Sequence, residues 1–270
     1  MQKTIHKSKP LNLFYQNDFI SQTEKKSILN YISTLNPIWE NRYSSTTTEN
    51  RQLLRPVYWL GNWQFACLGY YHPPKGLFKR SVQAEEFPAC IQHVVTRIES
   101  KVRADFDPRD IPRGWELNTC LINFYGNRFE DGKKNDFARV GEHKDFEPGP
   151  VGSVSFGEKA LFQFVDSPNK GAKSNVVLQQ WLEDSSVQIF AGEKFKKKLF
   201  HRVQRVEDKG ILFKEAKTQD FETRRINFTF RYVPREHFVK ACNLPENLQN
   251  DIRDYVTELG TQSSFWKTQL

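Results

Sequence analysis

The sequence predicts an α+β fold, with one β-rich domain and flanking helices that lie mainly on its N-terminal side. From about residue 115 to residue 233, apolar residues form short alternating runs separated by glycine, proline and aspartate, which is the pattern of β-strands. Outside this stretch, three segments carry apolar residues at helical spacing. Many short strands at close spacing favour a sandwich, a barrel or a jelly roll. A chain of 270 residues is long enough to give such a domain its own core.

Three helices are expected. The first covers residues 21–35, where Ser21 and Glu24 have the spacing of a capping box and an apolar face follows. The second begins near Pro88 and carries four aliphatic residues at helical spacing. The third opens with Pro245 at its first position and ends at a glycine.

Six strands are expected in the β-rich stretch. Each has four to nine residues, is rich in β-branched or aromatic side chains, and is bounded by turn residues. They are residues 121–125, 153–156, 161–165, 187–192, 201–206 and 225–233.

The composition limits the class of protein. Aromatic residues make up 14% of the chain, which argues against intrinsic disorder. No segment has the length and apolarity of a membrane span or of a secretory signal, so we expect a soluble monomer in the cytoplasm, or in the nucleus of a eukaryotic cell. The four cysteines are too widely spaced for a zinc ribbon. The net charge of +8 favours an anionic partner without identifying it.

A metal site is suggested by the segment His143-Lys144-Asp145. In a strand, residues two apart project to the same side, so one strand end can offer both an imidazole and a carboxylate. His201, at the start of another expected strand, can supply a second imidazole. Two histidines and one carboxylate form the ligand set of non-haem Fe(II) oxygenases. The alternative at this point is that these are ordinary surface residues.

Two strands have one polar and one apolar face. In residues 225–231, Arg225, Asn227 and Arg231 alternate with isoleucine and phenylalanine, and in the earlier strand Asn123 and Tyr125 share a face. If the apolar faces pack in the core, the two arginines point into whatever the other face lines, where they could hold carboxylates. The alternative is an edge strand with a solvated face.

The order of these motifs resembles the AlkB family. Asn-x-Tyr, His-x-Asp, a distant histidine and Arg-x-Asn-x-x-x-Arg follow one another as in those Fe(II)/2-oxoglutarate-dependent nucleic-acid demethylases, over roughly residues 60–233. The resemblance implies a double-stranded β-helix, or jelly roll, over residues 61–240. Residues 1–60 would then form an N-terminal helical flank, and residues 241–270 a C-terminal helix packed on the same domain.

The resemblance also implies roles for single residues. His143, Asp145 and His201 would bind Fe(II). The 2-oxoglutarate would be held by five residues, with Arg225 at its distal carboxylate and Arg231 at the end that chelates iron; the other three are Asn123, Tyr125 and Asn227. Glu147 would meet the damaged base, and Trp63 and Tyr70 would form the aromatic wall of the base pocket. With O2, such an enzyme releases formaldehyde, succinate and CO2.

Two features bear on the substrate. His143 follows Tyr125 by eighteen positions, about twice the family's usual spacing, and the polar insertion is expected to be a surface loop at the mouth of the site. A basic run surrounds His201 and is either a solvated face or a track for phosphates. It consists of Lys194, Lys196, Lys197, Lys198, Arg202 and Arg205.

Three functions stay open on the sequence. The first is demethylation of alkylated DNA or RNA, single-stranded or with the base flipped out of a duplex. The second is oxidation of a protein or small molecule by the same chemistry, which is favoured if Trp63 and Tyr70 do not line the pocket. The third, a nucleic-acid binder with a vestigial jelly roll, is disfavoured by the intact ligand and arginine sets.

Overall fold

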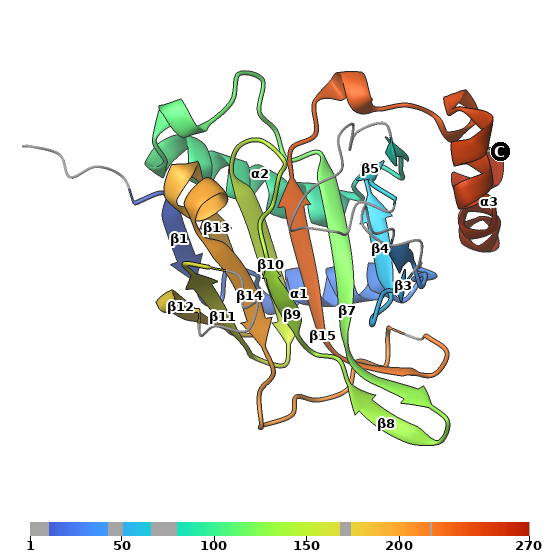
Figure 1. Cartoon of the computed structure of the whole chain (residues 1–270), viewed down its shortest axis with the longest axis horizontal. Helices are drawn as coiled ribbons and strands as arrows, with labels where there is room; N and C mark the ends of the chain where they lie inside the picture. Colours follow the sequence, from blue (N-terminus) through green and yellow to red (C-terminus); the bar gives the residue numbers. More distant parts are fainter. Residues whose placement is uncertain (1–10, 43–50, 66–79, 168–173, 217, 270) are drawn as a thin grey trace, which may run out of the picture.

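Two antiparallel β-sheets face each other at the centre of the protein (Figure 1). The computed structural model describes residues 11–42, 51–65, 80–167, 174–216 and 218–269. The arrangement is the double-stranded β-helix that the sequence predicts, in a mixed α+β fold.

The large sheet has seven strands. In spatial order they are β1 (Leu13–Gln16), β13 (Ser186–Phe190), β10 (Val151–Gly157), β15 (Phe221–Arg231), β7 (Thr119–Glu130) and β4 (Val57–Leu60), with β8 (Lys133–Asp136) paired to β7. The small sheet has the order β12 (Val176–Leu182), β11 (Ala160–Val165), β14 (Phe200–Gln204) and β9 (Val140–His143). Two short pairs complete the strands: β2 (Asn41–Arg42) with β3 (Arg51–Gln52), and β5 (Asn62–Trp63) with β6 (Val82–Gln83).

All three expected helices are present as α1 (Gln22–Ile32), α2 (Ala89–Asp105) and α3 (Glu246–Gly260). The side chains of Ser21 and Glu24 form the expected capping box at the start of α1. Pro245 is the residue before α3 rather than its first helical residue. No helix in these described ranges combines the length and the apolarity needed to cross a bilayer.

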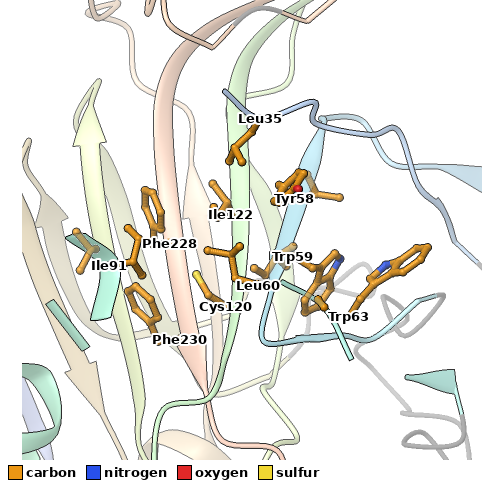
Figure 2. Packing of buried hydrophobic residues seen from close by; sticks show 14 of the residues in the cluster. Leu35, Tyr58, Trp59, Leu60, Trp63, Ile91, Cys120, Ile122, Phe228 and Phe230 are labelled. Atoms are coloured by element: carbon orange, nitrogen blue, oxygen red, sulfur yellow. The ribbon is translucent and has the colours of Figure 1, made fainter. Parts of the chain in front are cut away.

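The main core lies between the large sheet and the helices α1 and α2. Ile122 of β7 and Phe228 and Phe230 of β15 point to this side, where Ile91 of α2 joins them (Figure 2). The alternation seen in the sequence therefore does place the apolar side chains in a core. The opposite face of the same strands, which carries the polar residues, is turned toward the small sheet.

The six expected strands are all present, but the N-terminal 60 residues are more than a helical flank. Strands β1 and β4 from this segment belong to the large sheet, where β4 pairs with β7. Residues 57–60, Val-Tyr-Trp-Leu, are buried at every position, so they lack the alternation that marks a half-exposed strand.

The insertion after Tyr125 is a β-hairpin rather than an irregular loop. Strand β7 continues to Glu130, turns through Asp131 and Gly132, and returns as β8, which projects from the end of the sheet (Figure 1). The two turn residues have φ angles of 51° and 72°, the left-handed conformation that two-residue hairpin turns need.

Candidate metal and cosubstrate site

The two predicted histidine ligands are neighbours across the small sheet. Strands β9 and β14 are antiparallel, and their register places His143 opposite His201, with 4.1 Å between the ring centroids. Asp145 follows the end of β9, and its Oδ2 lies 3.4 Å from His201 Nε2. One ligand atom from each of the three residues lies within 4.8 Å of the others, the only such convergence of histidine, cysteine and acidic side chains in the described ranges.

Both imidazoles are prepared to act as neutral ligands. Desolvation lowers the pKa of His143 and lowers that of His201 well below its usual range. His143 Nδ1 lies 2.8 Å from the carbonyl oxygen of Gly141, and because that oxygen can only accept, Nδ1 must carry the proton. Nε2 then carries a lone pair rather than a proton, as a metal ligand requires, and the hydrogen bond fixes the ring.

The carboxylate of Asp145 is kept ionised by an arginine. Burial is the largest single influence and would raise its pKa, but the positive charges around it, of which Arg231 contributes most, together hold the pKa well below its usual range. Arg231 donates from Nε to Asp145 Oδ1 at 2.9 Å, and its Nη2 forms an ion pair with the same oxygen at 2.7 Å. Oδ2 is the oxygen that faces His201. Two neutral imidazoles and an ionised carboxylate on one side of a cavity fit a divalent iron ion with open positions opposite.

One cavity between the two sheets is lined by every predicted metal and cosubstrate residue. The small sheet and the segment after β9 contribute the three ligands, and the large sheet contributes polar side chains from β7 and β15. These eight residues are His143, Asp145, His201, Asn123, Tyr125, Arg225, Asn227 and Arg231.

The strand register explains how β7 and β15 form one polar surface. Arg225 lies opposite Tyr125, and Asn227 opposite Asn123, so the two predicted motifs are adjacent although about a hundred residues separate them. On the other side of β15, Ser155 of β10 accepts a hydrogen bond from Arg225 Nη2 at 3.1 Å. The buried Arg225 has no carboxylate within ion-pair distance among the described side chains.

Arg231 and Glu147 differ from their expected positions. Arg231 is bound to Asp145 and also lies 3.4 Å from Glu147 Oε2, so its guanidinium orients a ligand rather than standing free for the cosubstrate. Glu147 is buried and does not line the cavity. Burial raises its pKa, against the opposing effect of Arg231. In this conformation Glu147 therefore faces an arginine of the protein.

The expectation that Trp63 forms a wall of a base pocket is corrected by the structure. Its indole is 1% exposed in the main core (Figure 2). It packs edge-on against Trp266, with 5.7 Å between the ring centroids. Its Nε1 donates to Glu40 Oε1 at 2.5 Å, so the polar atom of the ring is also satisfied inside the core. Tyr70 lies outside the described residues.

The basic run divides into exposed and buried members. Lys194, Lys197 and Lys198 are exposed on a π-helical turn, η3 (Glu193–Lys198), that leads into β14. Lys196 differs because its Nζ is buried. Desolvation lowers the pKa of Lys196, and the negative charges of Asp145 and Glu147 oppose this lowering. Arg202 is held by Glu142 at 2.7 Å. Lys196 and Arg202 are therefore not available, in this structure, for an exposed track of phosphate contacts.

Sequence reasoning missed two residues of the cavity. Phe162 of β11 stacks on the His201 ring at 5.3 Å, and Arg55, which precedes β4, donates from Nε to Asn123 Oδ1 at 2.7 Å. The alternating pattern Phe-Gln-Phe in β11 does indicate a strand face with aromatic side chains, which includes Phe162. Nothing in the sequence near Arg55 indicates that it reaches the polar face of β7.

Comparison with known proteins agrees with this geometry. The family profile of the 2OG-Fe(II) oxygenase superfamily matches residues 12–231. The solved structure of OsALKBH1 is similar, with a TM-score of 0.52 and 21% sequence identity over 84% of this chain and 100% of that chain, which shows a shared fold. A structure of YcfD, a ribosomal oxygenase from Escherichia coli, with cobalt and succinic acid gives a TM-score of only 0.31 at 10% identity, over 94% of this chain and 65% of YcfD.

No curated protein sequence matches the chain significantly. The profile match extends over most of the chain and includes the facial triad, and this family uses Fe(II) as its metal and 2-oxoglutarate as its cosubstrate. The residues found here suit both, because three donors converge for a metal and an arginine-lined cavity adjoins them. This chain therefore belongs to the 2OG-Fe(II) oxygenase superfamily and is an oxygenase whose triad is His143, Asp145 and His201.

Proposed function

We propose that this oxygenase removes N-linked alkyl groups from bases of DNA or RNA, a reaction that repairs alkylation damage. The observation that carries the proposal is the set of motifs resembling the AlkB family, in the same chain order, whose metal and cosubstrate residues all line one cavity. Bound Fe(II), 2-oxoglutarate and O2 would supply the oxidising chemistry, with release of succinate, CO2 and formaldehyde.

The protein's own residues would bind and orient the reactants. Arg225, with Tyr125 and Asn227 beside it, would pair with the distal carboxylate of 2-oxoglutarate, and Asn123 would donate to the same ligand. Arg231 would hold Asp145 in place by a hydrogen bond and an ion pair to the same oxygen. These roles agree with the burial and register of the strands and await direct tests.

The charge near the cavity supports an anionic substrate. A cleft of about 620 Å³ adjoins the cavity and shares Arg55, Val140 and Val203 with it. The cleft is also lined by Arg139, which is exposed. An exposed arginine in such a cleft could contact a phosphate while a base enters the cavity.

The limits of the domain are proposed as well. We place the oxygenase region at residues 61–240, with an N-terminal flank that adds two strands to the sheet and a C-terminal helix packed on the same domain. We propose a monomer that acts in the cytoplasm, or in the nucleus of a eukaryotic cell.

The direct test is turnover of methylated oligonucleotides. The purified protein, with Fe(II), 2-oxoglutarate and ascorbate, should release formaldehyde from N-methylated single-stranded DNA or RNA, and an unmethylated oligonucleotide of the same sequence should give none. His143→Ala should abolish the release. Succinate formation without formaldehyde from any oligonucleotide would contradict the proposal while leaving the oxygenase chemistry intact.

A second candidate is oxidation of a protein or small molecule. It is favoured by one observation, the burial of Trp63 in the main core, because the aromatic wall expected for a base pocket then lacks one of its two members. This candidate predicts that methylated oligonucleotides leave the rate of 2-oxoglutarate decarboxylation unchanged. The first candidate predicts that they stimulate it.

A further inference from the structure

Arg55 is a buried arginine that the roles above leave without a function. Only 6% of it is exposed, and it lines the cavity that contains the triad. Two contacts with described side chains stand out: Nε donates to Asn123 Oδ1, and the guanidinium lies 5.0 Å from the centre of the Tyr125 ring. No described carboxylate lies within ion-pair distance of it, although an unpaired charge is costly to bury.

The hydrogen bond to Asn123 fixes which way the amide points. An arginine can only donate, so the atom of Asn123 that faces Arg55 must be the carbonyl oxygen. The amino group Nδ2 is then on the other side of the amide, and Asn123 lines the cavity. Arg55 therefore holds Asn123 so that the amino group of Asn123 is available to a ligand in the cavity. A carboxylate of that ligand could accept a hydrogen bond from it.

Arg55 also adds a second positive charge to the same end of the cavity. In the large sheet, β7 lies between β15 and β4, so Arg225, on β15, and Arg55, which precedes β4, approach Tyr125 from opposite sides. The two guanidiniums lie 4.9 Å and 5.0 Å from the Tyr125 ring centre. Two buried cations without carboxylate partners among the described residues make this end of the cavity suited to an anion.

We infer that Arg55 is a positioning residue of the 2-oxoglutarate site. It orients Asn123 and contributes positive charge where the distal carboxylate binds. The inference rests on the proposed assignment of Asn123, Tyr125 and Arg225 to 2-oxoglutarate, and it is independent of the nature of the substrate that is oxidised.

The test measures 2-oxoglutarate binding directly. Isothermal titration of 2-oxoglutarate into the protein loaded with Mn²⁺ gives a Kd without turnover. For Arg55→Gln the Kd should rise by about ten- to a hundredfold, the usual effect of removing a hydrogen bond to a charged group. Arg55→Lys keeps the charge but not the planar group of donors, so its Kd for 2-oxoglutarate should lie between those of Arg55→Gln and the native protein.

Arg128→Gln is the matched control. Like Arg55, Arg128 lies over an aromatic ring and donates a hydrogen bond to the oxygen of a side-chain amide. Arg128 lies on β7 and does not line the cavity. Its Kd for 2-oxoglutarate should equal that of the native protein. Mn²⁺ affinity and melting temperature, measured for every variant, separate a local effect from loss of the fold.

Three results would overturn the inference. An unchanged Kd in Arg55→Gln, with a raised Kd in Arg225→Ala, would reject Arg55 and keep the cosubstrate site. An unchanged Kd in both variants would reject the site and Arg55 together. A raised Kd in Arg55→Gln that is matched by an equal loss of Mn²⁺ affinity would show general damage rather than positioning.

Discussion

The two oxygens of the Asp145 carboxylate have different surroundings. Oδ1 accepts a hydrogen bond from Arg231 Nε and forms an ion pair with its Nη2, and Oδ2 faces His201. A carboxylate held in this way presents one oxygen to a metal in a fixed direction, which is the usual role of a residue that hydrogen-bonds a ligand. Arg231 thus belongs to the metal site at least as much as to the cosubstrate site.

A substitution at this arginine tests that view. Arg231→Met should weaken metal binding by about ten- to a hundredfold, the range typical of residues that orient metal ligands. The measurement is titration with Mn²⁺ or with Fe²⁺ under anaerobic conditions. Native metal affinity in this variant would mean that Asp145 needs no support from Arg231.

Arg225 is expected to act on the cosubstrate alone. Arg225→Ala should raise the KM for 2-oxoglutarate by about ten- to a hundredfold, because the variant cannot make the hydrogen bond to a carboxylate in a buried site. Steady-state kinetics at varied 2-oxoglutarate give this value. Oligonucleotide binding, measured in parallel, should change little; equal losses in both measurements would argue against a specific contact.

Glu40 gives the core a pH dependence. It is buried beneath Trp59 and Trp63, and burial, partly offset by their hydrogen bonds, raises its pKa to about 8. The folded state therefore keeps a proton that the unfolded chain releases near pH 4.5. Stability from this group is complete below that pH and is lost as the pH rises toward 8, by up to about 1.4 kcal/mol per pH unit.

Glu40→Gln should remove this loss. The amide keeps an oxygen for the two indole donors and cannot ionise, so the variant should become more stable relative to the native protein as the pH rises from 5 to about 8. Urea unfolding across this range is the measurement. Glu207→Gln, at an exposed acid, is the control and should show a constant difference.

At the scale of elements, η3 is the segment where the sequence and the structure differ most in detail. The run Lys-Phe-Lys-Lys-Lys looks uniform, yet it turns Phe195 and the end of Lys196 inward and leaves three lysines exposed. Lys198 of these lies 3.2 Å from Glu193. Any track for phosphates on this turn is therefore centred on Lys194 and Lys197.

The salt dependence of oligonucleotide binding tests this track. Lys194 and Lys197, both replaced by Gln, should weaken binding and make the log–log salt slope shallower by about 0.7 to 0.9 for each phosphate that is no longer neutralised. The same charge change at Lys240 and Lys267, which are exposed in the C-terminal part, is the control. Equal salt slopes in the two double variants would show that η3 is an ordinary solvated surface.

For the whole molecule, the site connects the two sheets. The metal ligands belong to the small sheet and its edge, whereas Arg225 and Arg231 come from the large sheet. A metal with its cosubstrate should therefore stabilise the sandwich as a unit. At about 100 times the Kd, a ligand that binds only the folded state adds about 2.7 kcal/mol to the free energy of unfolding.

Thermal unfolding should show this stabilisation. Mn²⁺ with 2-oxoglutarate should raise the melting temperature by several degrees, since about 1 kcal/mol corresponds to roughly 2–4 °C in a domain of this size. The His143→Ala, Asp145→Ala double variant should show no such increase. An equal increase in the variant would place the binding of the metal elsewhere on the protein.

The sequence by itself determined the elements whose signal is local. Capping residues and spacing locate the three helices, and the alternation in β7 and β15 gives both the strands and the face that carries Asn123, Tyr125 and the arginines. The His-x-Asp pair is also local, because a strand end places both side chains on one side. These predictions succeed because each depends on residues a few positions apart.

The tertiary structure decided everything that depends on which strands are neighbours. The register of β9 with β14 brings His143 to His201, and the position of β4 beside β7 brings Arg55 to Asn123. The same holds for Trp63, Lys196 and Arg231. Their residue types would suit a pocket wall, a phosphate contact and a cosubstrate contact respectively, but they suit the positions found in the structure just as well. Their surroundings come from segments distant in the chain, and burial and pairing with those segments, rather than local sequence, set what each side chain can bind.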